Sequence, residues 1–473
     1  MDVASLTIFS VRQGLLQKKF SATELAQAFL GKIREKEQDI HAFLAVSEEL
    51  ALSQALEIDR KISKGESLPE LAGVPISVKD AILVEGLVCT AGSRMLEHYI
   101  APYDATVIQK AKEAGAVILG KTNMDEFGMG SSTENSAFGP TKNPRDLTRV
   151  PGGTSGGSAA SVASEEALVS LGEDTGGSIR LPAAFCGVVG IKPTYGAVSR
   201  HGVIAVASSL DQVGTMGKTV EDARKLFEVI CGKDPKDGTS VEQRERPTAK
   251  TSLKDITIGV PKEYFEAGLD KKVGDLVKKG IRLMEQGGAH VVEISLPHTQ
   301  YALASYYVID MSEISANLAR YDGLRYGKHV AKGKLLEEYE ESRGQGFGEE
   351  VKRRIMLGTY ALSAGYYDAF YLKAQKVRTL LKQDFEKAFE KVDVVAGPVA
   401  PFLPFKLGER SADPLAMYLA DIYTVPVNLT GLPAISLPAG TVEGLPVGLQ
   451  LIGKPFCEQT LFETGALFEE IQS

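Results

Sequence analysis

The first helix of the chain is predicted by the spacing of its apolar residues. Ser21-Ala-Thr-Glu24 has the form of a capping box, in which a hydroxyl and a glutamate three residues later satisfy free backbone amides. Leu25, Phe29 and Ile33 then recur at helical spacing and fall on one face. We therefore expect an N-terminal helix that begins after Ser21.

A short strand with a lysine near its end is predicted further along. Val74, Ile76 and Val78 alternate with other side chains, and the last position of the alternation is Lys79. Helix-like stretches separate many of the other strand candidates, which is the order of elements in an α/β sheet. These further candidates are residues 116–119, 167–171, 188–191, 256–260, 392–396 and 434–437.

The polar segment 233–254 separates two unlike halves of the chain. It contains Asp-Pro-Lys-Asp-Gly and Arg-Pro, which are typical of a loop or linker. Residues 1–232 carry most of the motifs, whereas residues 255–473 are mainly helical in pattern. With 473 residues, 44% of them apolar, the chain is long enough for a large core, and we expect residues 1–473 to form one domain.

Composition narrows the class of protein. The sequence has neither a run of about 18 apolar residues nor a basic leader before an apolar segment, so we expect a cytoplasmic protein without a membrane span. A net charge of −8 disfavours direct binding of polyanions, so a partner would have to hold any nucleic acid. The four cysteines lie far apart in the sequence, which predicts inert thiols. The six histidines form no HExxH-like pair, so the spacing predicts no metal site.

Two matches to known motifs support only minor alternatives. Gly115-Ala-Val-Ile-Leu-Gly-Lys-Thr122 fits the P-loop pattern, but Ala-Val-Ile-Leu is typical of a buried strand and not of a phosphate-binding turn. Gly153-Thr-Ser-Gly-Gly157 fits the nucleophile elbow GxSxG, yet a loop precedes it where a strand is required. An ATP-binding scaffold, or a hydrolase that uses His290, His298 or His329, is therefore not favoured.

Two glycine-rich runs carry the candidate chemistry, namely Val150-Pro-Gly-Gly-Thr-Ser-Gly-Gly-Ser158 and Asp174-Thr-Gly-Gly-Ser-Ile-Arg180. Glycine lets backbone amides approach a developing anion and the hydroxyls offer an oxygen nucleophile, so the runs predict an acyl-transfer site. A hydroxyl needs a base, and with no suitably placed histidine the best candidate is Lys79, acting as a neutral amine under the glycine loops. A surface lysine paired with Asp80 is the alternative.

Together with Gly73-Val-Pro-Ile-Ser-Val-Lys-Asp80, these runs resemble the amidase signature family, whose catalytic group is a Ser, cis-Ser, Lys triad. The resemblance implies an α/β fold with a large mixed β-sheet covered by helices on both faces. It also implies Ser178 as the nucleophile and Lys79 as the base. The bridging position corresponds to Thr154, a departure that keeps the hydroxyl and adds a methyl group, and Ser155 is the fallback.

Longer segments resemble one branch of this family, the glutamine-hydrolysing A subunits of tRNA-dependent amidotransferases. In that branch the amides of Thr175, Gly176 and Gly177 would bind the oxyanion. A glutamine pocket must hold an α-carboxylate and an α-ammonium group. The resemblance assigns these two roles to Arg354 and Asp421. It also places four other residues in the substrate pocket and leaves open which of the two tyrosines contacts glutamine: Gly130, Ser131, Tyr306 and Tyr307.

The implied function is to hydrolyse glutamine and to pass the ammonia to a large B subunit, while a small C subunit clasps the two together. There Glu-tRNA(Gln), and in many organisms Asp-tRNA(Asn), would be activated with ATP and amidated. The resemblance thus implies no cofactor in this chain, with ATP, magnesium and the tRNA held by the B subunit. The main alternative is a stand-alone amidase for another small amide, which would keep Lys79 and Ser178 but need no partner.

Overall fold

One continuous mixed sheet forms the centre of the protein. The computed structural model describes residues 2–242, 249–266 and 268–472. Its eleven-stranded sheet has the order β1-β3-β2-β4-β6-β5-β10-β11-β9-β7-β8. The edge strand β1 pairs antiparallel with β3, the pairs β3–β2, β2–β4, β9–β7 and β7–β8 are parallel, and the pairs from β4 to β9 are antiparallel. The strands are β1 (Phe43–Val46), β2 (Pro75–Lys79), β3 (Val117–Thr122), β4 (Val169–Asp174), β5 (Val189–Lys192), β6 (Gln212–Gly217), β7 (Thr257–Pro261), β8 (His290–Ile294), β9 (Val394–Pro398), β10 (Ala434–Val442) and β11 (Leu445–Gly453).

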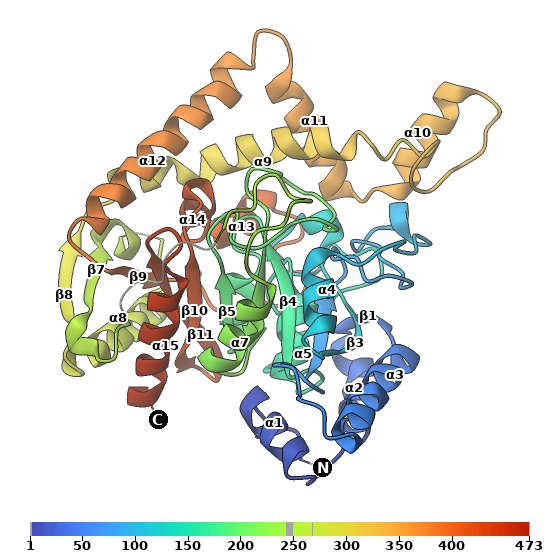
Figure 1. Ribbon diagram of the computed structural model, residues 1–473. Helices are drawn as coiled ribbons and strands as arrows, with labels where there is room; N and C mark the ends of the chain where they lie inside the picture. Colours follow the sequence, from blue (N-terminus) through green and yellow to red (C-terminus); the bar gives the residue numbers. More distant parts are fainter. Residues whose placement is uncertain (1, 243–248, 267, 473) are drawn as a thin grey trace.

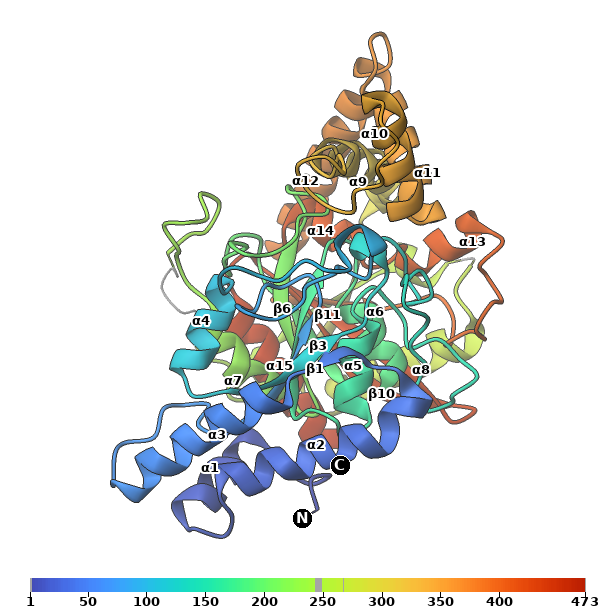
Figure 2. The same ribbon diagram turned by 90° about the vertical axis from the view of Figure 1, so that its right-hand side faces the viewer.

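Helices cover both faces of the sheet, which confirms the predicted fold class. α4, α7 and α15 lie on one face, and α5 and α6 lie on the other (Figures 1 and 2). α9, α11 and α12 form a layer across one end of the sheet, and α10 projects from that layer (Figure 1). The α-helices are α1 (Ile8–Leu16), α2 (Ala22–Ile40), α3 (Glu48–Ser63), α4 (Thr106–Glu113), α5 (Gly156–Ala163), α6 (Arg180–Cys186), α7 (Val220–Ile230), α8 (Lys271–Gln286), α9 (Ala302–Leu318), α10 (Leu335–Gly346), α11 (Glu349–Leu362), α12 (Lys373–Phe389), α13 (Pro414–Tyr418), α14 (Val425–Thr430) and α15 (Glu458–Gln472).

Most of the predicted elements are present. α2 begins directly after Ser21, whose hydroxyl accepts a hydrogen bond from the Glu24 amide while the Glu24 carboxylate accepts one from the Ser21 amide. Leu25, Phe29 and Ile33 are buried, so the predicted apolar face of this helix is the packed one. β2, β3, β4, β5, β7, β9 and β10 overlap the seven predicted strands. Residues 233–242 and 249–252 form neither helix nor strand, and residues 243–248 of the predicted linker lie outside the described ranges.

The sequence pattern does not predict four of the strands, namely β1, β6, β8 and β11. β6 reads Gln-Val-Gly-Thr-Met-Gly and β11 contains two glycines, which weaken the local preference for a strand. Both strands are buried along their whole length between two neighbours. Their conformation therefore depends on pairing within the sheet more than on local sequence. None of the described helices is long and apolar enough to cross a bilayer.

The candidate site lies where the parallel strands β2, β3 and β4 end. Lys79 is the last residue of β2, and Asp174 is the last residue of β4. Because β2 pairs in parallel with β4, the carboxyl ends of both strands meet at one edge of the sheet. The glycine-rich turn after β4 leads directly into α6, so the sheet positions the lysine and this turn as one rigid unit.

Candidate active site

Lys79 is fully buried (0% exposed) at the end of β2. Its Nζ lies 2.7 Å from Thr154 Oγ1, 2.9 Å from Glu173 Oε2 and 3.1 Å from the Glu173 carbonyl oxygen. Asp80, the alternative partner considered for this lysine, pairs instead with Lys121 at 2.9 Å. Lys79 is therefore an interior residue that faces one hydroxyl and one carboxylate.

Of the two candidate bridging hydroxyls, the structure brings that of Thr154 to Lys79. The peptide bond between Gly153 and Thr154 is cis. The Ser155 hydroxyl donates to the Glu173 carbonyl oxygen at 3.0 Å and lies 3.3 Å from the Glu173 amide, so it is tied to the backbone of β4. Thr154 is thus the candidate hydroxyl that contacts Lys79, whereas the Ser155 hydroxyl bonds to the backbone of β4.

Ser178 lies in the turn between β4 and α6, close to the segment that carries Thr154. The Ser155 amide donates to the Ser178 carbonyl oxygen at 3.1 Å. Within the described part of the chain the Ser178 hydroxyl has no hydrogen-bond partner, and the residue is 7% exposed. The turn requires glycine at position 177, where φ is +134° and a Cβ would lie 2.3 Å from Thr424 Oγ1.

The backbone amides of this turn differ in their partners. The Gly177 amide donates to Asp174 Oδ1 at 2.8 Å, so one of the amides predicted for oxyanion binding is already hydrogen-bonded. The amides of Gly176 and Ser178 donate to no acceptor among the described residues. Thr424 Oγ1 donates to the Gly176 carbonyl oxygen at 2.6 Å and fixes the orientation of the turn. Two amides of a rigid turn are therefore available next to Ser178.

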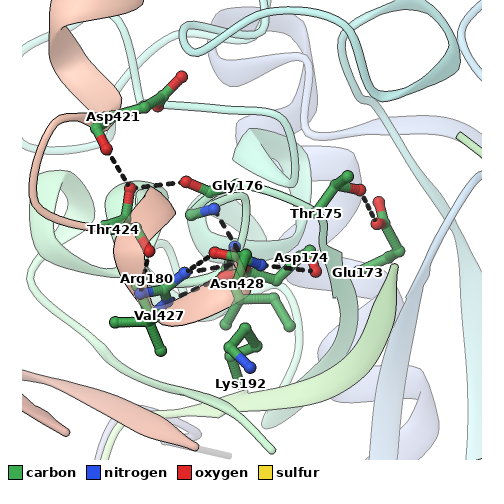
Figure 3. A network of polar contacts seen from close by, with 12 residues as sticks. Glu173, Asp174, Thr175, Gly176, Arg180, Lys192, Asp421, Thr424, Val427 and Asn428 are labelled. Atoms are coloured by element: carbon green, nitrogen blue, oxygen red, sulfur yellow. Dashed lines mark hydrogen bonds and ion pairs between the residues drawn. The ribbon is translucent and has the colours of Figure 1, made fainter. Parts of the chain in front are cut away.

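A buried polar network holds the base of the turn (Figure 3). Arg180 Nε and Nη2 donate to the two carboxylate oxygens of Asp174, each at 3.1 Å. Nη2 also donates to Asn428 Oδ1 at 2.5 Å, and Nη1 donates to Gln450 Oε1 at 2.7 Å. Arg180 and Asp174 are both 0% exposed, and the charge of Arg180 together with these hydrogen bonds keeps the pKa of Asp174 far below its usual value against the opposing effect of burial. The network links the turn to α14 and β11.

A second chain of buried hydrogen bonds leads away from Lys79 through Glu173. Thr175 Oγ1 lies 2.5 Å from Glu173 Oε1 and 2.9 Å from Asp211 Oδ1. Burial, and then the charge of Glu173, raise the pKa of Asp211 well above its usual range. Sequence analysis does not identify Glu173 or Asp211 as site residues. One feature of the sequence does point to Glu173: it lies near the end of a buried strand, where carboxylates are rare.

Asp421 belongs to a buried polar cluster formed with a loop and α9. Tyr307 Oη donates to Asp421 Oδ2 at 2.7 Å, and Ser131 Oγ lies 3.1 Å and 3.0 Å from the two carboxylate oxygens. Burial raises the pKa of Asp421 to about 7, against the opposing effect of these hydrogen bonds. Gly130 allows the loop to pass Asp125, because a Cβ at Gly130 would lie 2.5 Å from the Asp125 carboxylate.

Arg354 of α11 is buried between two carboxylates. Its Nη1 donates to Asp310 Oδ2 at 3.0 Å, and its Nε donates to Glu350 Oε1 at 2.8 Å. The guanidinium also lies over the rings of Tyr307 and Tyr418, with 5.3 Å and 5.4 Å to the two centroids. None of the described residues accepts a hydrogen bond from its Nη2. Arg354 is thus held rigidly and keeps one donor edge unused.

The two candidate tyrosines have different surroundings. Tyr307 is bonded to Asp421 and its ring stacks on Tyr418 with 4.1 Å between centroids. Tyr306 packs its hydroxyl against Gly176, where an added Cβ would lie 2.3 Å from Oη. Tyr306 therefore borders the turn that carries Ser178, and Tyr307 connects Asp421 to Arg354. Sequence analysis does not identify Asp310 and Glu350, the carboxylates that hold Arg354.

The two minor motifs have the structures expected of them. Residues 117–122 of the P-loop match form the buried strand β3, with Lys121 paired to Asp80. Irregular backbone precedes Ser155, and α5 starts at Gly156, so the GxSxG match is not an elbow after a strand. Among the described residues, no group of three or more His, Cys, Asp or Glu side chains is arranged to hold a metal ion.

Comparison with known proteins gives consistent matches over the whole chain. The amidase family profile matches residues 24–462. The A subunit of the glutamyl-tRNA(Gln) amidotransferase from Caldanaerobacter subterraneus is 55% identical and covers 99% of this chain and 97% of the relative. Its counterpart from Koribacter versatilis is 54% identical, with 99% of each chain covered. The crystal structure of the counterpart from Thermotoga maritima superposes with a TM-score of 0.82 at 41% identity, covering 99% of this chain and 95% of that one. The chain therefore belongs to the amidase family, within the group of the glutamyl-tRNA(Gln) amidotransferase A subunits.

Proposed function

We propose that this chain hydrolyses glutamine to glutamate and ammonia by acyl transfer to Ser178. The observation that supports this function most directly is the 2.7 Å contact between the buried Lys79 and Thr154, next to the turn that carries Ser178. A lysine is a suitable base for a serine when the protein interior can hold it as a neutral amine. The relatives are named A subunits of a glutamyl-tRNA(Gln) amidotransferase, which needs an amide donor, and we propose glutamine as that donor.

In the first step, neutral Lys79 takes a proton through the Thr154 hydroxyl while Ser178 Oγ attacks the amide carbon of glutamine. The carbonyl oxygen becomes an oxyanion, which the two available amides of the turn, those of Gly176 and Ser178, would hold. When the C–N bond breaks, the proton returns through Thr154 to the leaving nitrogen, and ammonia departs. Water, deprotonated by the same relay, then cleaves the glutamyl ester and regenerates Ser178.

The polar groups around Asp421 and Arg354 account for recognition of the amino-acid end of glutamine. The Asp421 carboxylate would bind the α-ammonium group, with Ser131 and Tyr307 fixing its orientation. Arg354 would bind the α-carboxylate through its unused Nη2, since its other donors are already held by Asp310 and Glu350. The Tyr306 hydroxyl, next to Gly176, would contact the substrate close to the reacting amide.

The affinity for glutamine should fall as pH decreases below neutrality. Burial raises the pKa of Asp421 to about 7, so this carboxyl is charged above that pH and neutral below it. Protonation of Asp421 removes the negative charge that pairs with the substrate ammonium group, so glutamine binds more weakly on the acidic side. We expect Kd to rise about tenfold between about pH 8 and about pH 6. Calorimetric titration of glutamine into the Ser178→Ala chain measures this without turnover.

Two controls separate Asp421 from other groups that titrate near neutrality. Asp421→Asn should bind glutamine weakly at every pH and show a flat profile. Glutaramate, which lacks the α-amino group, should bind the unmodified pocket with little pH dependence over the same range. A glutamine profile that keeps its slope in Asp421→Asn would assign the titration to a different group, such as Asp125, whose pKa burial also raises to about 7.

We further propose that the ammonia is used by partner subunits and not released. A large B subunit would hold ATP, magnesium and the misacylated tRNA, and a small C subunit would clasp the two chains. A chain with a net charge of −8 is poorly suited to hold tRNA by itself, which agrees with this division of labour. Glu-tRNA(Gln), Asp-tRNA(Asn) or both would be the acceptor, and that choice lies with the subunit that binds the tRNA.

Purification of the tagged chain from its own host tests both parts of this proposal. We expect two further proteins to co-purify, and ammonia release from glutamine to increase on addition of Glu-tRNA and ATP. The Ser178→Ala chain should bring down the same partners without releasing ammonia. Isolation of the chain alone, with no action on glutamine but cleavage of other small amides, would instead identify a stand-alone amidase.

A further inference from the structure

Glu173 is a buried carboxylate in direct contact with the proposed base. Its side chain is 1% exposed at the end of β4, and its Oε2 lies 2.9 Å from Lys79 Nζ. The other carboxylate oxygen accepts a hydrogen bond from Thr175 Oγ1 at 2.5 Å. Figure 3 shows Glu173 and Thr175 beside the network around Asp174, on the neighbouring part of the same strand and turn. The acyl-transfer steps described above assign no role to Glu173.

The surroundings of Lys79 Nζ match a charged ammonium group. Three acceptors lie within hydrogen-bonding distance, namely Thr154 Oγ1 and the carbonyl and carboxylate oxygens of Glu173. An ammonium group has three donors and no acceptor, so all three contacts are satisfied only when Lys79 carries its proton. A negative charge at 2.9 Å stabilises that form further. The arrangement of the three acceptors therefore fits the ammonium form of Lys79.

We propose that Glu173 is a positioning residue that holds Lys79 protonated at rest and thereby sets the pH above which Ser178 can be activated. This inference rests on the proposed role of Lys79 as the base. Glu173 touches neither the substrate nor the reacting atoms; it acts on Lys79 alone. The consequence is that the pH dependence of the nucleophile belongs to the Lys79–Glu173 pair and not to an isolated lysine.

Hydrogen bonds favour the ionised form of Glu173 over that of the neighbouring carboxyl group, Asp211. The Thr175 hydroxyl donates to Glu173 and can accept from Asp211, which lies 2.9 Å away on its other side. Burial, and then the charge of Glu173, raise the pKa of Asp211 well above its usual range, which favours the protonated form of Asp211. The neutral acid and the hydroxyl thus form a chain that ends at Glu173 and stabilises its ionised form.

Several other charged groups face this pair and must be included in any pH profile. Asp125 is close enough for the charge of Lys79 to affect its pKa, and Asp310 of α9 is affected by the charge of Glu173. Asp211 borders a surface cavity of about 220 Å³. The titratable or charged groups that line this cavity together with Asp211 are Arg200, His201, Lys236 and Asp237.

Labelling by a fluorophosphonate tests the inference independently of glutamine and partners. In this reaction Ser178 Oγ forms a bond to phosphorus, the P–F bond breaks, fluoride leaves, and the hydroxyl proton passes to Lys79. The labelling rate, followed by intact-protein mass spectrometry from about pH 5 to about pH 10, should show an acidic limb where Lys79 loses its proton. Glu173→Gln keeps the shape of the side chain and removes its charge, so the acidic limb should move to lower pH by at least about one unit. On the acidic side, the labelling rate of this variant should then be about tenfold faster than that of the parent.

A second variant and a matched control keep the test decisive if Glu173→Gln is poorly folded. Thr175→Val removes the hydrogen bond that stabilises the Glu173 charge, so Glu173 should hold the Lys79 proton more strongly and the limb should move to higher pH. Opposite shifts in the two variants are not expected from structural damage alone. Glu166→Gln removes another buried carboxylate, bonded to Ser164 at 2.6 Å before the other end of β4, and should leave the limb unchanged.

The possible results separate this inference from the proposed function. A downward shift in Glu173→Gln, or an upward shift in Thr175→Val, supports the role of Glu173. Labelling of Ser178 with the same pH profile in both variants overturns the inference and leaves the acyl-transfer function intact. Labelling that survives in Ser178→Ala, or that does not depend on Lys79 in Lys79→Met, overturns the catalytic assignment and with it the inference.

Discussion

Ser178→Ala should lower kcat for glutamine hydrolysis by about 10⁴-fold or more. The change removes the only atom that forms a bond to the substrate in the proposed reaction, while the Lys79–Thr154 contact and the turn amides stay in place. Kd for glutamine should change little, because the groups around Asp421 and Arg354 are untouched. Ammonia release by the partner-bound chain and calorimetric binding of glutamine measure the two effects separately.

A serine elsewhere in the sheet provides the control for this change. Ser436 lies in β10, and its hydroxyl is a buried polar atom with no partner among the described residues. Ser436→Ala should therefore leave both kcat and stability close to those of the parent. If Ser178→Ala kept near-normal turnover, a different nucleophile would have to be sought, with Thr154 and Ser155 as the neighbouring hydroxyls to replace next.

The strands next to the site illustrate how far local sequence determines this fold. β2 is predicted from alternating apolar residues that end at Lys79, and β4 from the largely apolar run 167–171, so local sequence already places Lys79 at a strand end. β6 and β11 are not predicted, because their glycine-containing sequences become strands only between neighbours that come from distant parts of the chain. The family resemblance supplies the missing architecture, and the mixed sheet confirms it.

The candidate site shows the same division between local and long-range information. Lys79 and the glycine-rich turn can be recognised from local sequence, since each carries its chemistry within a few residues. The partners of these groups cannot, because hydrogen bonding between Lys79 and Glu173, or between Arg354 and Asp310, depends on how distant elements pack. A neighbouring carboxylate favours the charged form of a basic group, so such contacts between distant residues have to be known before the pH behaviour of the site can be predicted.

Arg180→Met should cost about 3 to 5 kcal/mol of unfolding free energy. Methionine retains much of the apolar stem but leaves the Asp174 carboxylate, fully buried, without its counter-charge. Asp174 also accepts the amides of Gly177 and Ile179, so its displacement would loosen the turn that carries Ser178. We therefore expect a lower urea midpoint and also a lower kcat in the fraction that remains folded.

Two comparisons identify an uncompensated charge as the cause of this loss. Arg224→Met breaks a partly exposed pair with Glu228 on α7, at 3.0 Å, and should cost less than about 1 kcal/mol. The double change Arg180→Met with Asp174→Asn should be more stable than Arg180→Met alone, because a neutral amide replaces the stranded carboxylate. If the double change were instead additive with the single ones, the network would stabilise the turn through packing, and the charge of Asp174 would have little part in holding Ser178.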